Sequence, residues 1–218
     1  MRNRWFIALA AIGLHISIGS VYAWSVLTRP IMVDMGFTLS QTTWTFSLAI
    51  LMLGLSAGFL GSFAEKIGPK KSGLLAMLFW VTGLFGTAYA LSIHNLTLLY
   101  LFYGIIGGIG LGIGYITPVS TLVKYFPNRP GFATGLAIMG FGFASLIAGP
   151  LMQYLVAQVG LIDNFIILGL IYLVVMGASS LYLKAPQPKQ PTRTTKDKST
   201  MYVHNHGMLA NDAMKTWQ

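Results

Sequence analysis

Five long stretches of this chain contain no Asp, Glu, Lys or Arg, and their lengths constrain the fold more than any other feature. The charge-free runs are residues 5–28, 35–64, 72–123, 130–162 and 164–183. A helix needs about 20 apolar residues to cross a bilayer, so the third run is too long for one span. The segment Ser92-Ile93-His94-Asn95 divides it. The runs therefore predict six transmembrane helices, at 5–28, 41–63, 73–92, 97–122, 131–157 and 164–183.

Composition supports a membrane protein and argues against an enzyme. Hydrophobic residues make up 55% of the chain and charged residues 9%, whereas soluble domains carry about 25% charge. The chain has no cysteine, which excludes disulfides and thiolate metal sites. No predicted span holds a nucleophile–base pair or a cluster of metal ligands. We therefore expect no catalytic residues, no metal site and no cofactor.

The basic residues predict how the helices are oriented. The chain has 14 Lys and Arg residues and a formal net charge of +9. All of them except Arg29 fall on one side of the six predicted spans, and such an excess marks the cytoplasmic side. This distribution explains the charge without a nucleic-acid partner. We expect a multi-pass protein of the inner (plasma) membrane, in contact with the lipid bilayer and with both termini in the cytoplasm.

A charged segment joins the second and third predicted spans and reads Gly-Ser-Phe-Ala-Glu-Lys-Ile-Gly-Pro-Lys-Lys, residues 61–71. Gly61 and Gly68 are expected to supply backbone freedom for a tight turn, and Pro69 to fix its exit. The charged residues are expected to keep the loop in the cytoplasm. They are Glu65, Lys66, Lys70 and Lys71. Such a loop fits any basic cytoplasmic turn, but the pattern also resembles the signature loop between helices 2 and 3 of the major facilitator superfamily of transporters.

That resemblance implies an architecture. Members of the superfamily have twelve helices in two halves, each built from inverted three-helix repeats, with substrate held between the halves. We therefore expect an all-α membrane protein in which residues 1–184 form a six-helix bundle of two inverted repeats, equivalent to the N-terminal half. Residues 185–218 are Pro-rich and polar. They are expected to form a cytoplasmic linker toward a helix 7 that the chain lacks.

The segment between the fourth and fifth spans carries a second resemblance. Residues 124–135 read Lys-Tyr-Phe-Pro-Asn-Arg-Pro-Gly-Phe-Ala-Thr-Gly. This is similar to the aromatic-Phe-Pro-x-basic-basic-Gly-x-Ala-x-Gly loop of the oxalate/formate antiporter family, and residues 19–25 and 107–118 look like patterns of the same family. The matching loop residues are Phe126, Pro127, Arg129, Gly131 and Gly135, while Pro130 replaces the second basic residue. The resemblance implies exchange of small organic anions, monocarboxylates or dicarboxylates, by alternating access.

Candidate cavity residues lie in the first and fourth spans. Tyr22 and Tyr115 occupy comparable places in repeat-related helices, and their hydroxyls suit a carboxylate. An interfacial or core position is the alternative for both. Trp24 and Thr117 are weaker candidates. His15 is an ionisable group deep in a span, where such groups usually face a cavity. A neutral histidine bonded to a backbone carbonyl is the alternative, and it is favoured because no acid is available as a partner for His15.

The fourth span is also rich in glycine. Gly104, Gly108 and Gly112 form one stripe, and Gly110 and Gly114 form another. A nucleotide-binding loop would join a strand to a helix, which this run does not. We therefore predict a helix that packs closely against its neighbours on two faces.

The predicted spans contain no Lys, Arg, Asp or Glu. The resemblance implies that the cationic substrate ligands lie in helices 8 and 11 of the other half. Oxalate carriers are expected to have a glutamine where this chain has Val21, which weakens the case for oxalate itself. The predicted function is the front half of an organic-anion transporter that is incomplete alone, with residues 61–71 as the cytoplasmic gate.

Other interpretations remain open at this stage. Two six-helix chains could pair with each other or with a sister subunit, and a non-transporting membrane sensor or scaffold also fits. The exact substrate and the choice between exchange and ion coupling are not determined by these residues.

Overall fold

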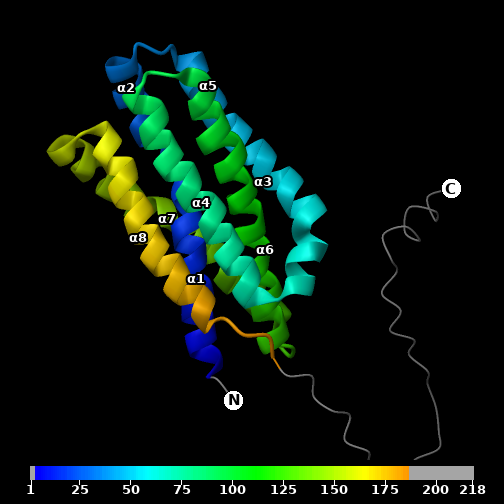
Figure 1. Ribbon diagram of the computed structural model, residues 1–218. Helices are drawn as coiled ribbons and strands as arrows, with labels where there is room; N and C mark the ends of the chain where they lie inside the picture. The colour runs from blue at the N-terminus through cyan, green and yellow to red at the C-terminus, as the bar shows by residue number, and fades with distance from the viewer. Residues whose placement is uncertain (1–2, 187–218) are drawn as a thin grey trace, which may run out of the picture. The chain divides into compact units, whose positions relative to one another are not determined.

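A computed structural model describes residues 3–186 of the chain. Within this range the protein consists of helices, without strands, and six helical segments are long and apolar enough to cross a membrane. They run side by side as a bundle, with the first and last described residues at the same end (Figure 1). The all-α fold and the six spans predicted from the charge-free runs are confirmed. The predicted linker lies outside the described residues, apart from residues 185 and 186.

Four spans are single helices, and two, the first and the fourth, carry additional segments. The first comprises α1 (Arg4–Gly19), a 3-10 turn η1 (Ser20–Ala23) and α2 (Trp24–Met35), and the second is α3 (Leu39–Ile67). The third is α4 (Pro69–Ser92), and the fourth comprises α5 (Leu96–Leu99), a π-helical segment η2 (Tyr100–Gly107) and α6 (Gly108–Tyr125). The fifth is α7 (Pro130–Val159) and the sixth is α8 (Leu161–Tyr182). Pro118 lies inside α6 and Pro150 inside α7.

The short connections follow from local capping chemistry. Gly36 ends α2 in the left-handed region at φ 69°, which glycine adopts without a steric penalty. Thr38 and Gln41 then form a capping box that starts α3. Asn95 caps α5 by accepting a hydrogen bond from the Leu98 amide at 3.0 Å. This last connection is the break that the segment 92–95 predicts.

Two helices continue beyond the ends that the charge pattern predicts. Arg29 and Asp34, expected in a loop, lie inside α2. The segment expected to turn at residues 61–71 is helical up to Ile67, so Gly61 lies within α3 and supplies no turn. Gly68 alone leaves the helical conformation, at φ 83°, and Pro69 starts α4. Charged residues are compatible with helix at a membrane surface, so they mark the interface rather than the helix end.

The contacts between spans keep the same pattern when the first three spans are exchanged with the last three. The first span packs on the fifth and the second on the fourth. These two pairs are exchanged when the first three spans are swapped with the last three. The contacts of the third span with the sixth, and of the first with the fourth, map onto themselves. This pattern is what two inverted three-helix repeats produce.

The fourth span packs closely on both of its predicted glycine faces. A Cβ on Gly108 would lie 2.8 Å from the Ala49 carbonyl oxygen of α3. A Cβ on Gly110 would lie 2.6 Å from the Trp80 backbone nitrogen of α4. Ser56 of α3 also directs its hydroxyl to the Gly108 carbonyl at 3.4 Å. The absence of side chains therefore lets three backbones approach one another, as the two stripes predict.

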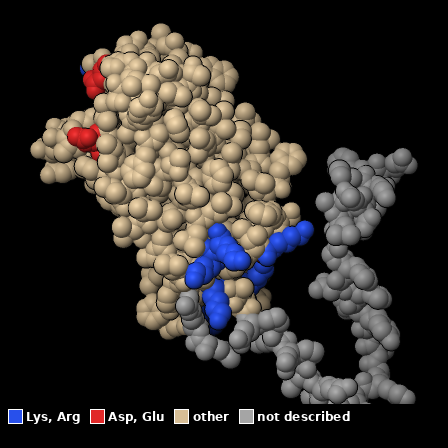
Figure 2. Space-filling view, viewed as in Figure 1, with Lys and Arg blue, Asp and Glu red and all other residues tan. Residues whose placement is uncertain are grey.

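Charged side chains are segregated between the two ends of the bundle. The starts of the odd spans and the ends of the even spans lie together, and we call this the basic end. It carries Arg4, Lys66, Lys70, Lys71, Lys124, Arg129 and Lys184. Asp34 and Asp163 lie at the opposite end, and Figure 2 shows this separation on one face of the molecule.

Candidate functional site

Three aromatic rings from three spans form a continuous surface, which we call the tyrosine wall: Tyr22, Phe141 and Tyr115. The Phe141 ring lies 5.2 Å from the ring of Tyr22 and 5.2 Å from that of Tyr115, and both contacts are edge-to-face. Tyr22 is 45% exposed and Tyr115 is half-buried. The structure therefore brings together the two residues proposed as cavity candidates.

Local structure explains how Tyr22 reaches this position. The 3-10 turn η1 interrupts the first span at residues 20–23 and changes the direction of side chains relative to a regular helix. Gly19, immediately before the turn, faces α7, where a Cβ would lie 2.7 Å from the Cβ of Ala144. The small residues bring the first and fifth spans together and place Tyr22 against Phe141.

His15 lies directly behind the wall. Its imidazole is fully buried and stacks on Tyr115, with ring centroids 5.5 Å apart and an interplanar angle of 23°. The Nδ1 atom lies 2.6 Å from the Ala137 carbonyl oxygen and the Nε2 atom 3.0 Å from the Tyr115 carbonyl oxygen. A neutral imidazole donates to one of these carbonyls, and only the doubly protonated ring donates to both. His15 thus joins α1 to α6 and α7 rather than lining an open space.

Trp24 and Thr117 lie in packed interfaces between helices, and Thr117 also lines a small cavity of about 60 Å³ at the basic end. The buried Trp24 indole donates to the Thr42 carbonyl at 3.2 Å and packs on Tyr103 with centroids 4.3 Å apart. The buried Thr117 hydroxyl hydrogen-bonds with Ser72 of α4 and donates to the Ile113 carbonyl at 2.8 Å. Both side chains have their polar atoms satisfied inside the bundle. The structure therefore places them as contacts between helices.

Phe141 is the member of the wall that the sequence did not single out. It lies within a long apolar run of α7, and nothing in that run distinguishes it from the other aromatic residues. Its role follows from its two ring contacts, which join spans far apart in the sequence. The flanking Gly140 and Gly142 mark a place where the helix carries little side-chain bulk, but they do not predict which neighbour the phenyl ring meets.

The predicted gate residues lie at the basic end, with one ion pair across two spans. The Lys124 Nζ atom of α6 lies 3.4 Å from a Glu65 carboxylate oxygen of α3, and each side chain is about half exposed, at 52% and 47%. The partner of Glu65 is therefore Lys124, and not one of the lysines within residues 61–71. Gly61 faces α6 as well, and a Cβ there would lie 2.8 Å from the Ile116 Cδ1 atom.

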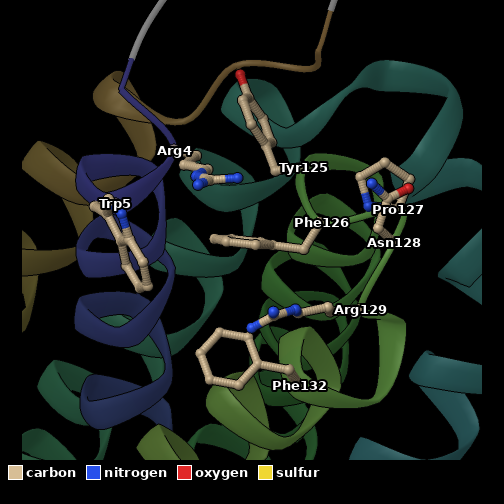
Figure 3. Close-up of a pocket in the computed structure, with 8 residues that line it drawn as sticks. All are labelled: Arg4, Trp5, Tyr125, Phe126, Pro127, Asn128, Arg129 and Phe132. Atoms are coloured by element: carbon tan, nitrogen blue, oxygen red, sulfur yellow. The ribbon is translucent and has the colours of Figure 1, made fainter.

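The loop between the fourth and fifth spans forms one side of a cavity of about 310 Å³ at the basic end. The other side is the start of α1, with Arg4 and Trp5. The lining residues are Arg4, Trp5, Tyr125, Phe126, Pro127, Asn128, Arg129 and Phe132. Figure 3 shows the Phe126 ring between the side chains of Arg4 and Arg129. Gly131 and Gly135 do not line the cavity, and a Cβ on either would meet no atom within 4 Å.

The chemistry available at the wall is hydrogen bonding and ring contact. Its hydroxyl groups belong to Tyr22 and Tyr115. Among the described residues, the Lys or Arg nearest to Tyr22 in sequence is Arg29 in α2, and neither tyrosine has a hydrogen bond or cation–π contact with a Lys or Arg. Phenolic hydroxyls donate to carboxylate oxygens, but a carboxylate held by them alone in a membrane interior would keep most of its desolvation cost. The wall therefore suits one side of a binding site whose cation comes from elsewhere. The described residues also contain no cluster of three or more His, Asp or Glu side chains for a metal ion.

Comparison with known proteins gives consistent results. The model of the Major Facilitator Superfamily matches residues 6–216. An uncharacterised transporter of this superfamily from Escherichia coli, YhjX, is 32% identical over 89% of this chain and 47% of its own length. The oxalate:formate antiporter of Oxalobacter formigenes is 28% identical over 78% of this chain and 40% of its own. Human monocarboxylate transporter 14 is 28% identical over 78% of this chain and 33% of its own.

The chain thus spans less than half the length of these three relatives. Two of these relatives are named for their substrates, one for oxalate with formate and the other for monocarboxylates. All of these substrates are small organic anions.

Proposed function

Because this chain belongs to the Major Facilitator Superfamily, we propose that it is the N-terminal six-helix half of a secondary transporter for small monocarboxylates. In this proposal the bundle rocks against a second six-helix half and exposes the substrate to each side of the membrane in turn. The observation that carries the proposal is the tyrosine wall. It presents two hydroxyl groups, from repeat-related spans, on a partly open surface of the bundle.

The charge distribution supports a partner half. A buried carboxylate needs a cationic or strong donor partner, and among the described residues the tyrosine hydroxyls of the wall have no hydrogen bond to a lysine or arginine, the nearest in sequence to Tyr22 being Arg29. We infer that the second half supplies the cation. Two copies of this chain would double the tyrosines and still lack the charge, so pairing with itself supports carboxylate transport less well.

Monocarboxylates are preferred over oxalate as the substrate class. A dicarboxylate carries two charges and would need a second cationic ligand, whereas one carboxylate and an apolar remainder match two hydroxyl groups beside the Phe141 ring. Val21, in place of the glutamine expected in oxalate carriers, is consistent with this choice. The relatives named as monocarboxylate transporters support the same class.

The proposed location is the inner (plasma) membrane with the basic end in the cytoplasm. The basic end carries most of the described Lys and Arg residues, and the opposite end carries Asp34 and Asp163. Positive charge marks the cytoplasmic side. In this orientation the Glu65–Lys124 pair would hold the second and fourth spans together at the cytoplasmic surface, where a gate must open and close.

Uptake into liposomes tests this function. The full 218-residue chain would be reconstituted alone, and also after co-expression with the C-terminal six-helix half of the similar E. coli transporter. We expect saturable uptake of labelled formate or lactate only with both halves, with competition by other monocarboxylates and none by glucose. Uptake by the chain alone would favour self-pairing, and an assembled pair without carboxylate uptake would contradict the proposal.

A further inference from the structure

We propose that the cavity at the basic end is a binding site for the phosphodiester headgroup of an anionic membrane lipid. The site involves the start of α1 and the segment 125–132, so it lies apart from the tyrosine wall. The proposed transport cycle assigns no role to the aromatic-Phe-Pro pattern of residues 124–135, and lipid binding would give this loop one. The inference does not depend on which substrate the protein carries.

The first argument is charge. Arg4 and Arg129 line the cavity, and no Asp or Glu does. In the part of the chain that the structure describes, Glu65 pairs with Lys124, while Asp34 and Asp163 lie at the other end of the bundle. The two guanidinium groups therefore create a positive potential that no neighbouring carboxylate among the described residues offsets. Planar guanidinium groups bind phosphate with paired N–H donors.

The second argument is that aromatic contacts already position the Arg4 guanidinium in the absence of a ligand. The Arg4 Cζ atom lies 5.6 Å from the centroid of the Phe126 ring and 6.0 Å from that of Trp5. These contacts hold the cation over aromatic faces and leave its N–H edges free to meet an anion. Trp5, Phe126 and Phe132 also contact one another edge-to-face, at 5.7, 6.5 and 5.9 Å. The rings form a fixed frame, visible in Figure 3.

The third argument is depth in the membrane and shape. Arg4 begins the first span, Tyr125 ends the fourth and Pro130 begins the fifth, so the cavity lies where headgroups lie. Trp5 and Phe132 are 52% and 48% exposed, and aromatic residues at this depth face the lipid interface. A volume of about 310 Å³ falls at the lower end of small-molecule sites, about 300–1,000 Å³. A phosphate would meet the arginines while the glycerol and upper acyl chains lie along the exposed rings.

Lipid selectivity of the purified chain tests this inference. The full chain would be placed in nanodiscs of phosphatidylcholine with a small fraction of phosphatidylglycerol carrying the same acyl chains, and native mass spectrometry would measure how much of each lipid stays bound. We expect a preference for phosphatidylglycerol in the native chain. The double variant Arg4→Gln/Arg129→Gln should reduce that preference about tenfold.

A charge-matched control separates this site from general attraction. The variant Arg29→Gln/Lys184→Gln removes the same charge from exposed positions outside the cavity and should keep the preference. Arg129→Lys, which retains charge but loses the paired donors, should give an intermediate value. Equal loss in the cavity and control variants, or no preference in the native chain, would overturn the proposal. Displacement of the lipid by millimolar inorganic phosphate would reassign the cavity to soluble phosphate and overturn the lipid assignment.

Helix content from circular dichroism checks each variant. Both arginines are exposed at the basic end, so we expect the fold to survive their replacement. If the double variant did not fold, the single variants Arg4→Gln and Arg129→Gln would be compared with Arg29→Gln and Lys184→Gln, with the same outcomes deciding the question.

Discussion

The fourth span presents two contrasting regions to its neighbours. Toward α3 and α4 it offers glycine faces, where Gly108 and Gly110 bring backbones into contact. Toward α7 it offers Tyr115, whose ring meets Phe141 and stacks on His15. The first region contains almost no side-chain chemistry and the second contains most of the polar and aromatic groups of the site. One face of the span therefore serves helix packing and another carries the candidate site. Substitutions on the two faces should have different consequences.

The largest effect is expected on the glycine faces. Gly110→Leu would drive a side chain into the Trp80 backbone and the Phe79 Cβ, 2.6 and 2.9 Å from the position of a Cβ. Backbone atoms cannot yield as a flexible side chain does, and overpacking costs about 1–3 kcal/mol or more. We expect loss of the folded bundle, measured as low monodispersity and a lower unfolding temperature in detergent.

The matched control for that substitution is Gly142→Leu. Gly142 is exposed on α7 and a Cβ there would meet no atom within 4 Å. We expect this variant to fold with a stability close to that of the native chain. If both leucine variants were equally destabilised, the effect would come from helix propensity or from the added hydrophobic side chain. Close packing of the glycine faces would then not be its cause.

His15 packs against Tyr115 in the second region and should show the next largest effect. His15→Ala would remove a fully buried ring and its contacts with the Ala137 and Tyr115 carbonyls. The cavity and the lost hydrogen bonds should lower the free energy of unfolding by about 2–4 kcal/mol. Equilibrium unfolding in a denaturing detergent would measure this. His15→Gln, which keeps one donor and much of the volume, should recover part of the loss.

Substitutions on the wall should affect transport and leave stability unchanged. Tyr22→Phe/Tyr115→Phe removes two hydroxyl groups and keeps the ring contacts with Phe141. Uptake of labelled monocarboxylate by the assembled halves should fall about tenfold, with an unfolding temperature near the native value. Tyr154→Phe, at an exposed tyrosine of α7 outside the wall, is the control. Equal losses in the two variants would remove the wall from the substrate path.

Only a small effect on stability is expected at the basic end. Glu65 and Lys124 are about half exposed, and pairs of this kind contribute at most about 1 kcal/mol. Glu65→Ala should therefore change unfolding little, yet slow exchange more than it weakens substrate binding, because the pair joins α3 to α6 at the proposed gate. Normal exchange rates with poor binding would contradict the gate assignment. The swap Glu65→Lys/Lys124→Glu should restore part of the rate.

The sequence predicted the packing of the fourth span better than the composition of the site. Spacing along one helix determines which residues share a face, so the stripes of Gly108 and Gly110 were found correctly. Spacing does not determine which neighbour a face meets. Trp24 and Thr117 were therefore proposed as cavity candidates from their position along the chain, and only the structure shows that both side chains hydrogen-bond between helices.

Contacts between distant spans account for the other differences. The sequence around Phe141 did not indicate its role, because that role depends on contacts with two rings, Tyr22 and Tyr115, that are each more than twenty residues away in sequence. The Glu65 partner, Lys124, comes from another span for the same reason. The ends of α2 and α3 were misjudged because charge marks the membrane boundary and a helix continues through it until a residue such as Gly36 or Gly68 allows the turn.

The most direct test of the central claim is the accessibility of the wall in an assembled transporter. The native chain has no cysteine, so Tyr22→Cys introduces a single thiol whose labelling by a membrane-impermeant maleimide is unambiguous. We predict labelling from the aqueous phase in the assembled halves, with protection by formate or lactate and none by glucose. Tyr154→Cys should show no protection. A Tyr22→Cys thiol that stays unlabelled from water, or labels at the same rate with and without monocarboxylate, would contradict the claim that the tyrosine wall lines the substrate path.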